Sequence, residues 1–429
     1  MPKAARGLGL LGAALALGIF GACGESQTTN GPRGSAAGAG AAGSAGVGAG
    51  GNPVSASGAG NAGVAVGGAN VNGGAGGASG GGVSGGGGAA VGGTAGAAGG
   101  SCAATSATLA AWPGKNDVKT LDTKGQFASD LSGLTYEPGA TAATGVLWAV
   151  NNLSGTLFRL VQSANGFAPD AANGWSAGKQ LRFPNGKGGP DAEGVTFGAT
   201  VADGVYVCSE HDLDDSGTSR LSVLRYDVSA AGAELIASHE WNLTALLPKV
   251  GANAGLEAIT WVPDAFLTSK GFFDDTKAHA YAPAEYANHG SGLFFVGVEE
   301  TGKIHVLALN HGSSAATLVA TISTPNSGVM GLEFDRDAGN LWFNCDDTCG
   351  NKSGVLGIDT SAGSATLGHF VLRHQFQRPS SLPDSNNEGI AIAPASECNA
   401  GFKRFFWTDD ADQDGFSLRS DLIPCDTCL

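Results

Sequence analysis

Five copies of one short phrase occur after residue 130, and this repeat restricts the fold more than any other feature. The copies read SGLTYEP, EGVTFG, EAITWVP, MGLEFD and EGIAIAP, and they begin at Ser132, Glu193, Glu257, Met330 and Glu388. Successive copies therefore start 61, 64, 73 and 58 residues apart. Self-similarity at a period of this length is typical of architectures that repeat one structural unit.

A second aromatic-rich run follows each phrase and ends in polar or acidic residues. These runs read GVLWAVNN, GVYVCSEHD, GLFFVGVEE, GNLWFNCDD and RFFWTDDADQD. Runs of about four to eight residues, rich in Val, Leu and aromatic side chains and separated by Gly or Asp turns, indicate β-strands. Several short strands per repeat predict an all-β fold in which the repeats are blades of a single β-propeller. We count five blades, and the spacing leaves room for a degenerate sixth.

Two segments depart from the regular repeat. The fifth repeat lacks an outermost strand, and the run DVKTLD at residues 117–122 is expected to supply it and close the ring. The third repeat carries an insertion over residues 264–292. An ordinary long loop and a lid over the binding face are both consistent with this insertion.

Residues 1–23 have the pattern of an export signal. Lys3 and Arg6 precede an apolar stretch over residues 8–20, which is too short to span a bilayer comfortably. The run FGAC at residues 20–23 resembles the signal of bacterial lipoproteins, in which the cysteine is lipidated; an ordinary secretion signal is the alternative. The resemblance implies an exported protein, anchored through Cys23 at the outer membrane or cell surface of a Gram-negative bacterium.

Residues 24–101 and 102–429 differ in composition. The first segment consists almost entirely of Gly, Ala, Ser, Asn and Val and cannot bury a core, so we expect a flexible linker. The second is the expected propeller domain, with 37 of the 38 acids and 20 of the 23 Lys and Arg residues, a formal charge of −17. Such acidity argues against nucleic acid as a partner and leaves membrane contact to the lipid anchor. We expect a monomer that binds a cation and a small molecule or cell-surface partner.

The cysteines of this domain predict disulfides, because several cysteines in an exported chain are usually paired. They are Cys102, Cys208, Cys345, Cys349, Cys398, Cys425 and Cys428. The pair at 345 and 349 is close enough to close a small loop. A bridge from Cys102 to one of the last three would join the two ends of a closed ring, and Cys208, inside the run VYVCSE, is the expected free buried thiol. Zinc bound by the cysteines at 345, 349, 425 and 428 is the less favoured alternative.

Propeller geometry predicts where the polar ends of the repeats meet. The innermost strand of a blade begins, and the second strand ends, on the same face near the central channel. The residues that open the phrases and those that close the second runs should therefore surround one channel mouth. The carboxylates expected at this mouth are Glu193, Glu257, Glu388, Glu210, Glu299, Asp346, Asp409 and Asp410.

So many carboxylates in one narrow region would raise one another's pKa values unless a cation lay among them. Hard oxygen ligands without a matching set of Cys or His residues favour calcium over zinc or copper. Alternatively, each Glu of the phrase hydrogen-bonds backbone N–H groups of the neighbouring blade and closes the ring without a metal.

The run DADQDG, which starts at Asp410, is a second candidate calcium site. Its alternating Asp410, Asp412 and Asp414 resemble the first ligand positions of a calcium loop, and Asp421 takes the twelfth position. No helices flank the run, so an exposed acidic turn is an equal alternative.

The repeated phrases resemble two bacterial propeller families, the SdiA-regulated and the phytase-like (esterase-like activity of phytase) families. The resemblance covers most of residues 128–415 and rests on SGLTYEP with LWAV, D-x-EG-V-T with SE, LEAITW with VGVEE, and NEGIAIAP with TDD. It implies a propeller fold. Phytase-type propellers also use several calcium ions and a basic cluster that holds phosphate, and we can place no such cluster in this sequence.

Two functions remain open. In the favoured one, the propeller binds a ligand or partner at a calcium-occupied acidic face and performs no catalysis. The alternative is a calcium-dependent hydrolase of phosphate esters or lactones, in which the metal polarises an oxygen and a carboxylate activates water. Its candidate catalytic residues are Glu193, Glu257, Glu388 and His211. Gly-x-Ser-x-Gly matches surround Ser79 and Ser84 in the linker, where no fold positions a nucleophile, and Ser176 in the propeller domain, so this pattern does not decide between the two functions. The missing basic cluster favours the binding function.

Overall fold

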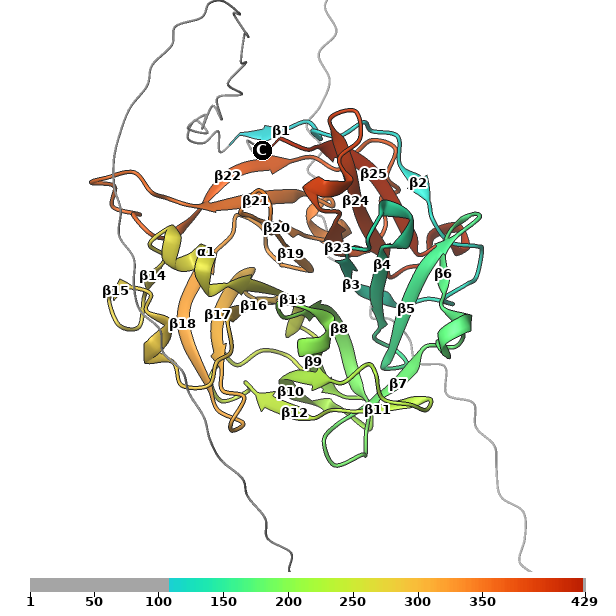
Figure 1. Cartoon of the computed structure of the whole chain (residues 1–429), viewed down its shortest axis with the longest axis horizontal. Helices are drawn as coiled ribbons and strands as arrows, with labels where there is room; N and C mark the ends of the chain where they lie inside the picture. The colour runs from blue at the N-terminus through green and yellow to red at the C-terminus, as the bar shows by residue number, and fades with distance from the viewer. Residues whose placement is uncertain (1–107, 427–429) are drawn as a thin grey trace, which may run out of the picture. The chain divides into compact units, whose positions relative to one another are not determined.

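The computed structural model of this protein describes residues 108–426, and its strands form a five-bladed β-propeller (Figure 1). The predicted all-β fold and the count of five blades are confirmed. Each repeated phrase forms the innermost strand of one blade. These strands are β3 (Leu131–Glu137), β8 (Pro190–Phe197), β13 (Leu256–Pro263), β19 (Gly331–Asp335) and β23 (Asn387–Ile392).

The remaining strands extend each blade outward from the axis, mainly in antiparallel order. The first blade adds β4 (Val146–Asn151), β5 (Thr156–Ser163), β6 (Gly166–Pro169), β7 (Lys179–Arg182) and β11 (Glu234–Ile236). The second adds β9 (Val205–Asp212), β10 (Asp215–Tyr226) and β12 (His239–Asn242). The third adds β16 (Gly292–Val298), β17 (Lys303–Leu309) and β18 (Ala316–Ser323). The fourth adds β20 (Asn340–Asn344), β21 (Ser353–Ile358), β22 (Phe370–Phe376) and β1 (Leu109–Ala110), and the fifth adds β24 (Phe402–Asp409), β25 (Leu418–Pro424) and β2 (Lys119–Thr120).

The amino-terminal segment of the described chain closes the ring. As predicted for residues 117–122, β2 is the outermost strand of the fifth blade and pairs antiparallel with β25. The side chain of Asp421 on β25 accepts hydrogen bonds from the indole N–H of Trp112 and the backbone N–H of Asn116, both at 2.8 Å. The sequence did not reveal that β1 also joins the fourth blade, in parallel with β22.

The insertion of the third repeat is a small packed unit rather than a long loop. It contains α1 (Asp264–Ser269), the hairpin of β14 (Phe273–Asp274) and β15 (His279–Ala280), and a 3-10 turn at Pro283–Glu285. Phe272, Tyr281 and Tyr286 are buried in the same apolar cluster as strands of the third and fourth blades. The insertion therefore stabilises the outer part of the third blade.

Five clusters of buried apolar side chains fill the spaces between successive blades in the described part of the chain. Each cluster draws its residues from two neighbouring blades; one contains Trp148 of the first blade and Tyr226 of the second. Because a blade is covered on both faces, its inner strands are buried along almost their whole length, which explains the unusually apolar phrases.

A steric constraint explains why the second residue of the phrase is glycine in four of the five copies. A Cβ atom at Gly133 would lie closer than 3.0 Å to the backbone of Glu193, and one at Gly389 would approach the backbone of Ser132 as closely. Each phrase thus meets the phrase of a neighbouring blade backbone to backbone around the axis. Ala258 takes the glycine's place in the third blade.

Two disulfides lie in the described residues. Cys345–Cys349 closes a small loop as predicted, and Cys398–Cys425 links the hairpin of β24 and β25. Since three of its four proposed ligands are disulfide-bonded, the zinc alternative is wrong. Cys208 is free and buried, as expected. Cys23, Cys102, Cys428 and the linker lie outside the described residues, and within 108–426 no helix has the length and apolar character to cross a bilayer.

Candidate metal centre at the channel mouth

A cavity of about 600 Å³ opens where the inner strands begin and the second strands end. Its wall carries carboxylates from several blades and from the turns between strands. They are Asp130, Asp191, Glu193, Glu210, Glu257, Glu299, Asp346, Glu388 and Asp410. Among the described residues that line this cavity, none is Lys or Arg. We call it the mouth cavity.

Three of these carboxylates meet at the inner end of the cavity. Glu193 on β8, Glu257 on β13 and Glu388 on β23 each place one oxygen within 4.8 Å of the others, and all three residues are buried. Calcium holds its oxygen ligands at about 2.3–2.6 Å, so oxygens with these separations fit around a single cation. We call these residues the glutamate triad.

A second group extends the triad toward the cavity wall. Glu210 at the end of β9 and Glu299 after β16 place oxygens within 4.8 Å of Glu257 and of each other. Glu257 therefore belongs to both groups. The arrangement offers a continuous set of hard oxygen ligands, which is the ligand type of calcium and magnesium.

Burial raises the pKa of each triad member well above the usual value for a glutamate. Neighbouring carboxylates raise these pKa values further, with Asp191 the largest such contributor at Glu193 and Asp410 at Glu388. Burial also raises the pKa of Glu210 to about 7 and that of Asp410 to about 6. Without a positive charge among them, these groups cannot all ionise at neutral pH without mutual repulsion.

The hydrogen bonds around the triad leave some of its oxygens without a partner. The amide of Asn152 donates to both oxygens of Glu193 at 3.2 Å, and the amide of Asn386 donates to Oε1 of Glu388 at 2.9 Å. Oε2 of Glu388 has no hydrogen-bond partner in the described structure, although the residue is only 6% exposed. A buried carboxylate oxygen without a donor is costly unless a cation contacts it.

Two of the five phrases open with a residue that is not acidic, Ser132 in the first blade and Met330 in the fourth. Ser132 donates its hydroxyl to the backbone carbonyl of Glu193 at 2.8 Å and so links the first and second blades. Met330 lines the mouth cavity and offers no oxygen ligand. The triad therefore comes from the second, third and fifth blades only.

His211 lies at the edge of the second carboxylate group. Its Nδ1 lies 2.9 Å from Oδ2 of Asp191 and 3.1 Å from the carbonyl oxygen of Ala252. Both His211 and Asp191 are buried, and together with Glu210 they form a third group with ligand atoms within 4.8 Å. The contact orients the imidazole beside the carboxylates.

Several acids predicted for metal binding lie elsewhere. Asp409 is fully buried in an ion pair with Arg419 at 2.9 Å and also accepts a hydrogen bond from Ser385. Asp412 and Asp414 do not line the mouth cavity, and Asp421 anchors Trp112, as described above. Of the alternating acids, Asp410 lines the mouth cavity and Asp412 and Asp414 do not, so the run does not add its three aspartates to the mouth. The calcium loop stays a prediction.

The sequence interpretation missed five polar residues of the cavity wall: Asp130, Asp191, Ser216, Asn253 and Asn386. Asp130, Asp191 and Asn386 each precede a phrase opening by two positions. Only Asp191 shares a strand with its phrase opening, Glu193 on β8, so the rule that residues two apart in a strand point the same way was a usable signal there alone.

Comparisons with known proteins give no family. No protein-family model matches the chain, and no curated protein matches it. The resemblance to the SdiA-regulated and phytase-like families therefore stands only at the level of the propeller fold.

Solved structures give weak matches. The PQQ-bound aldose sugar dehydrogenase from Streptomyces coelicolor is 14% identical with a TM-score of 0.34, over 71% of this chain and 98% of that one. A 6-phosphogluconolactonase candidate from Bacteroides uniformis is 12% identical with a TM-score of 0.28, over 67% and 70%. A protein from Lactobacillus plantarum is 11% identical with a TM-score of 0.29, over 68% and 66%. Similarity at this level carries no information about the chemistry of this chain.

Proposed function

We propose that this protein binds calcium at the glutamate triad and uses the bound ion to hold an oxygen-rich ligand in the mouth cavity. The observation that carries the proposal is the convergence of three buried carboxylates, one with an oxygen that has no partner within residues 108–426, in a wall whose described residues include no Lys or Arg. A divalent cation would supply the missing positive charge.

Calcium suits this site better than zinc. The available ligands are carboxylate oxygens, with one histidine at the margin. Calcium accepts six to eight such ligands in flexible geometry, whereas zinc prefers about four ligands that include nitrogen or sulfur. Water or ligand oxygens would complete the coordination on the side that faces the open cavity.

The size of the cavity supports a role beyond ion storage. A volume of about 600 Å³ lies within the range of small-molecule binding sites and far exceeds the space of one ion. An acidic wall repels free anions, so a carboxylate, phosphate or hydroxyl-rich ligand would bind through the calcium. Binding without catalysis is the simplest function of this arrangement.

Hydrolysis is a second candidate function, favoured by the His211–Asp191 pair. An imidazole oriented by a buried carboxylate lies beside Glu210, whose pKa of about 7 is suitable for a general base. A lactone fits this site better than a phosphate ester, because the cavity wall has no Lys or Arg to bind phosphate.

Calcium titration of the chelator-treated full-length protein tests the binding proposal. We expect saturable heat with calcium in wild type and in D426N, an exposed surface control, and affinity at least about tenfold weaker in E388Q. Absence of binding in the wild type, or unchanged binding in E388Q, would overturn the proposal.

Turnover assays test the second candidate separately. Nitrophenyl esters, nitrophenyl phosphate and simple lactones would be incubated with the protein in calcium and in chelator. Calcium-dependent turnover that H211N lowers at unchanged calcium affinity would support hydrolysis. Calcium binding without any turnover would leave the binding function.

The two disulfides support export, because such bonds persist in oxidising compartments. We propose that Cys23 anchors the exported chain to a membrane. Cell fractionation checks this: C23S should move the protein from the membrane fraction to the soluble fraction, and retention in the membrane fraction would contradict the anchor.

A further inference from the structure

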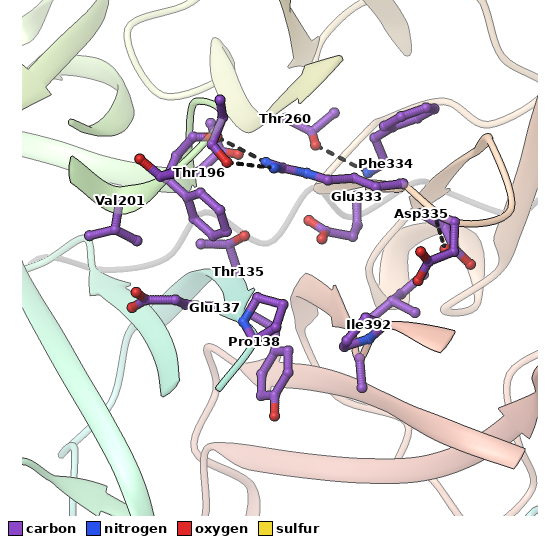
Figure 2. A pocket seen from close by; sticks show the side chains of 18 residues that line it. Thr135, Glu137, Pro138, Thr196, Val201, Thr260, Glu333, Phe334, Asp335 and Ile392 are labelled. Atoms are coloured by element: carbon purple, nitrogen blue, oxygen red, sulfur yellow. Dashed lines mark hydrogen bonds between the residues drawn. The ribbon is translucent and has the colours of Figure 1, made fainter. Parts of the chain in front are cut away.

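A second cavity, of about 330 Å³, lies at the other ends of the inner strands (Figure 2). It is lined by the carboxyl-terminal parts of β3, β8 and β19, by Thr260 of β13, and by residues that follow β23. Because the mouth cavity lies at the beginnings of the same strands, the two cavities open at opposite ends of the channel. We call this one the exit pocket.

The channel is closed between the two cavities. Gly133, Gly194, Ala258, Gly331 and Gly389 surround a void of only about 10 Å³. This volume holds at most about one water molecule. The exit pocket is therefore a separate site, and its chemistry is independent of the calcium proposal.

The fourth residue of the repeated phrase supplies the polar part of the exit pocket. This residue is Thr135 in the first blade, Thr196 in the second and Thr260 in the third, but it is Glu333 in the fourth. One carboxylate thus replaces a hydroxyl among the polar side chains of the pocket. Figure 2 shows Glu333 pointing into the pocket, toward the wall that carries Thr135 and Thr196.

These polar groups lack partners of their own. Within the described residues, the carboxylate of Glu333 forms no hydrogen bond, and burial raises its pKa to about 8. The hydroxyls of Thr135 and Thr196 also form none among residues 108–426, although each residue is only 2% exposed. Glu333 is half-buried, and all three side chains line the pocket, so a ligand in the pocket could supply the hydrogen-bond partners that the protein does not.

The nearby cations are engaged elsewhere. Arg336 donates to the carbonyl oxygens of Phe197, Gly198 and Ala199, and its guanidinium lies over the rings of Phe197 and Trp261. Lys403 forms a buried ion pair with Asp335 at 2.6 Å. Arg336 also lines the exit pocket, and its charge and that of Lys403 lower the pKa of Glu333, but among the described residues neither cation forms an ion pair with this carboxylate.

We infer that the exit pocket binds a small organic cation, a primary ammonium with an apolar body. The ammonium would donate to the carboxylate of Glu333 and to the hydroxyls of Thr135 and Thr196, which gives each of its three N–H groups an acceptor. Pro138, Phe334 and Pro394 offer apolar surface for the remainder of the molecule. The other carboxylates in the described lining of the pocket already accept hydrogen bonds, Glu137 from Trp148, Asp335 from Lys403 and Asp337 from the backbone N–H of Ala395. A metal ion therefore fits less well, because Glu333 alone among these carboxylates is left to bind it and calcium requires six or more ligands.

A pair of matched probes tests the inference. Tyramine carries a primary ammonium on a small aromatic body, and tyrosol replaces the ammonium with a neutral hydroxyl. Calorimetric titration of the full-length protein should give saturable 1:1 binding of tyramine and binding of tyrosol at least about tenfold weaker. E333Q should weaken tyramine binding at least about tenfold, while D426N, the surface control, should leave it unchanged.

Further measurements distinguish a direct effect on tyramine binding from misfolding of the variants. E333Q should retain the wild-type calcium affinity and circular dichroism spectrum, which shows that it folds and that the opposite mouth is intact. T196V, which replaces the hydroxyl with a methyl group of similar size, should also weaken tyramine binding. Equal affinity for tyrosol and tyramine, competition of calcium with tyramine, unchanged tyramine binding in E333Q or an absence of tyramine binding would overturn the inference.

Discussion

At the scale of single residues, several glutamates are buried near the axis of the propeller, where ionisation is unfavourable. Glu257 lies in both carboxylate groups of the mouth cavity, and Glu388 has an oxygen without a partner. A fold that only needed to close its ring would gain stability from apolar residues at these positions. The same cost appears in the exit pocket at Glu333, whose equivalents are threonine or alanine in the other blades.

A substitution at Glu257 separates the calcium role from a purely structural one. Without metal, E257Q should be more stable than wild type, because it removes a buried carboxylate that its neighbours repel. With calcium, wild type should gain stability and E257Q much less. Thermal unfolding with calcium and with chelator measures both effects, and a loss of stability in E257Q under both conditions would indicate a structural role.

His305 gives the fold a dependence on pH away from the channel. Burial lowers its pKa to about 4, and its Nε2 has no hydrogen-bond partner among the described residues. The unfolded chain, with a histidine pKa near 6.5, therefore binds more protons than the folded chain between about pH 4 and 6.5. The contribution of neutral His305 to the free energy of unfolding is therefore fully present above about pH 6.5 and is lost as the pH falls toward 4.

The variant H305Q tests this contribution. The free energy of unfolding of wild type, measured in urea, should fall more steeply between pH 7 and pH 5 than that of H305Q. The exposed residue His279 provides the control, and H279Q should follow wild type. Parallel curves for wild type and H305Q would refute the assignment.

At the scale of elements, the amino-terminal segment holds the ring together. Only two residues of β2 pair with β25, so the strand itself contributes little. Trp112 adds much more, because its ring packs against Trp342, Phe405 and Trp407 between the fourth and fifth blades. Asp421 on β25 accepts a hydrogen bond from the indole N–H of this tryptophan and holds it in place.

The variant W112A should therefore destabilise the propeller by about 3–5 kcal/mol, the usual cost of removing a large buried aromatic side chain. D421A should cost about 2–3 kcal/mol, because it leaves the indole N–H and a backbone N–H without their acceptor. Urea unfolding measures both, with D426A at an exposed position as the control. Changes below about 0.5 kcal/mol in both variants would show that ring closure does not depend on this anchor.

At the scale of the whole molecule, carboxylates from several blades gather at the channel mouth of a fold whose blades are joined by apolar clusters. The glutamate triad draws its residues from three blades, so a cation bound there would contact the second, third and fifth blades at once. Calcium should therefore stabilise the ring as a unit and not one blade alone.

Thermal unfolding provides the measurement. At a calcium concentration about 100-fold above its dissociation constant, binding adds about 2.7 kcal/mol of stability, which corresponds to an increase of several degrees in Tm. The triple variant E193Q/E257Q/E388Q should show no such increase. An equal increase in the triple variant would place calcium elsewhere on the protein.

The sequence by itself determined the repeat, and with it the all-β class, the five blades, the closing strand at residues 117–122 and the convergence of the phrase glutamates. It could do so because alternation of side chains and repetition of a phrase are local properties that a closed ring converts into shared positions around an axis. The same alternation would have identified Asp191, which lies on β8 two residues before Glu193.

Only the tertiary structure decided which acids face the cavity and which are used elsewhere. Asp409 and Asp410 are neighbours in sequence, yet one pairs with Arg419 and the other faces the mouth cavity. Asp421 fits a calcium loop by spacing but binds Trp112, more than three hundred residues away. Nothing in the sequence distinguishes Glu333 from other strand residues, and only the tertiary structure places it in the exit pocket, on the far side of the closed channel. These outcomes depend on partners distant in the chain, and no local pattern records them.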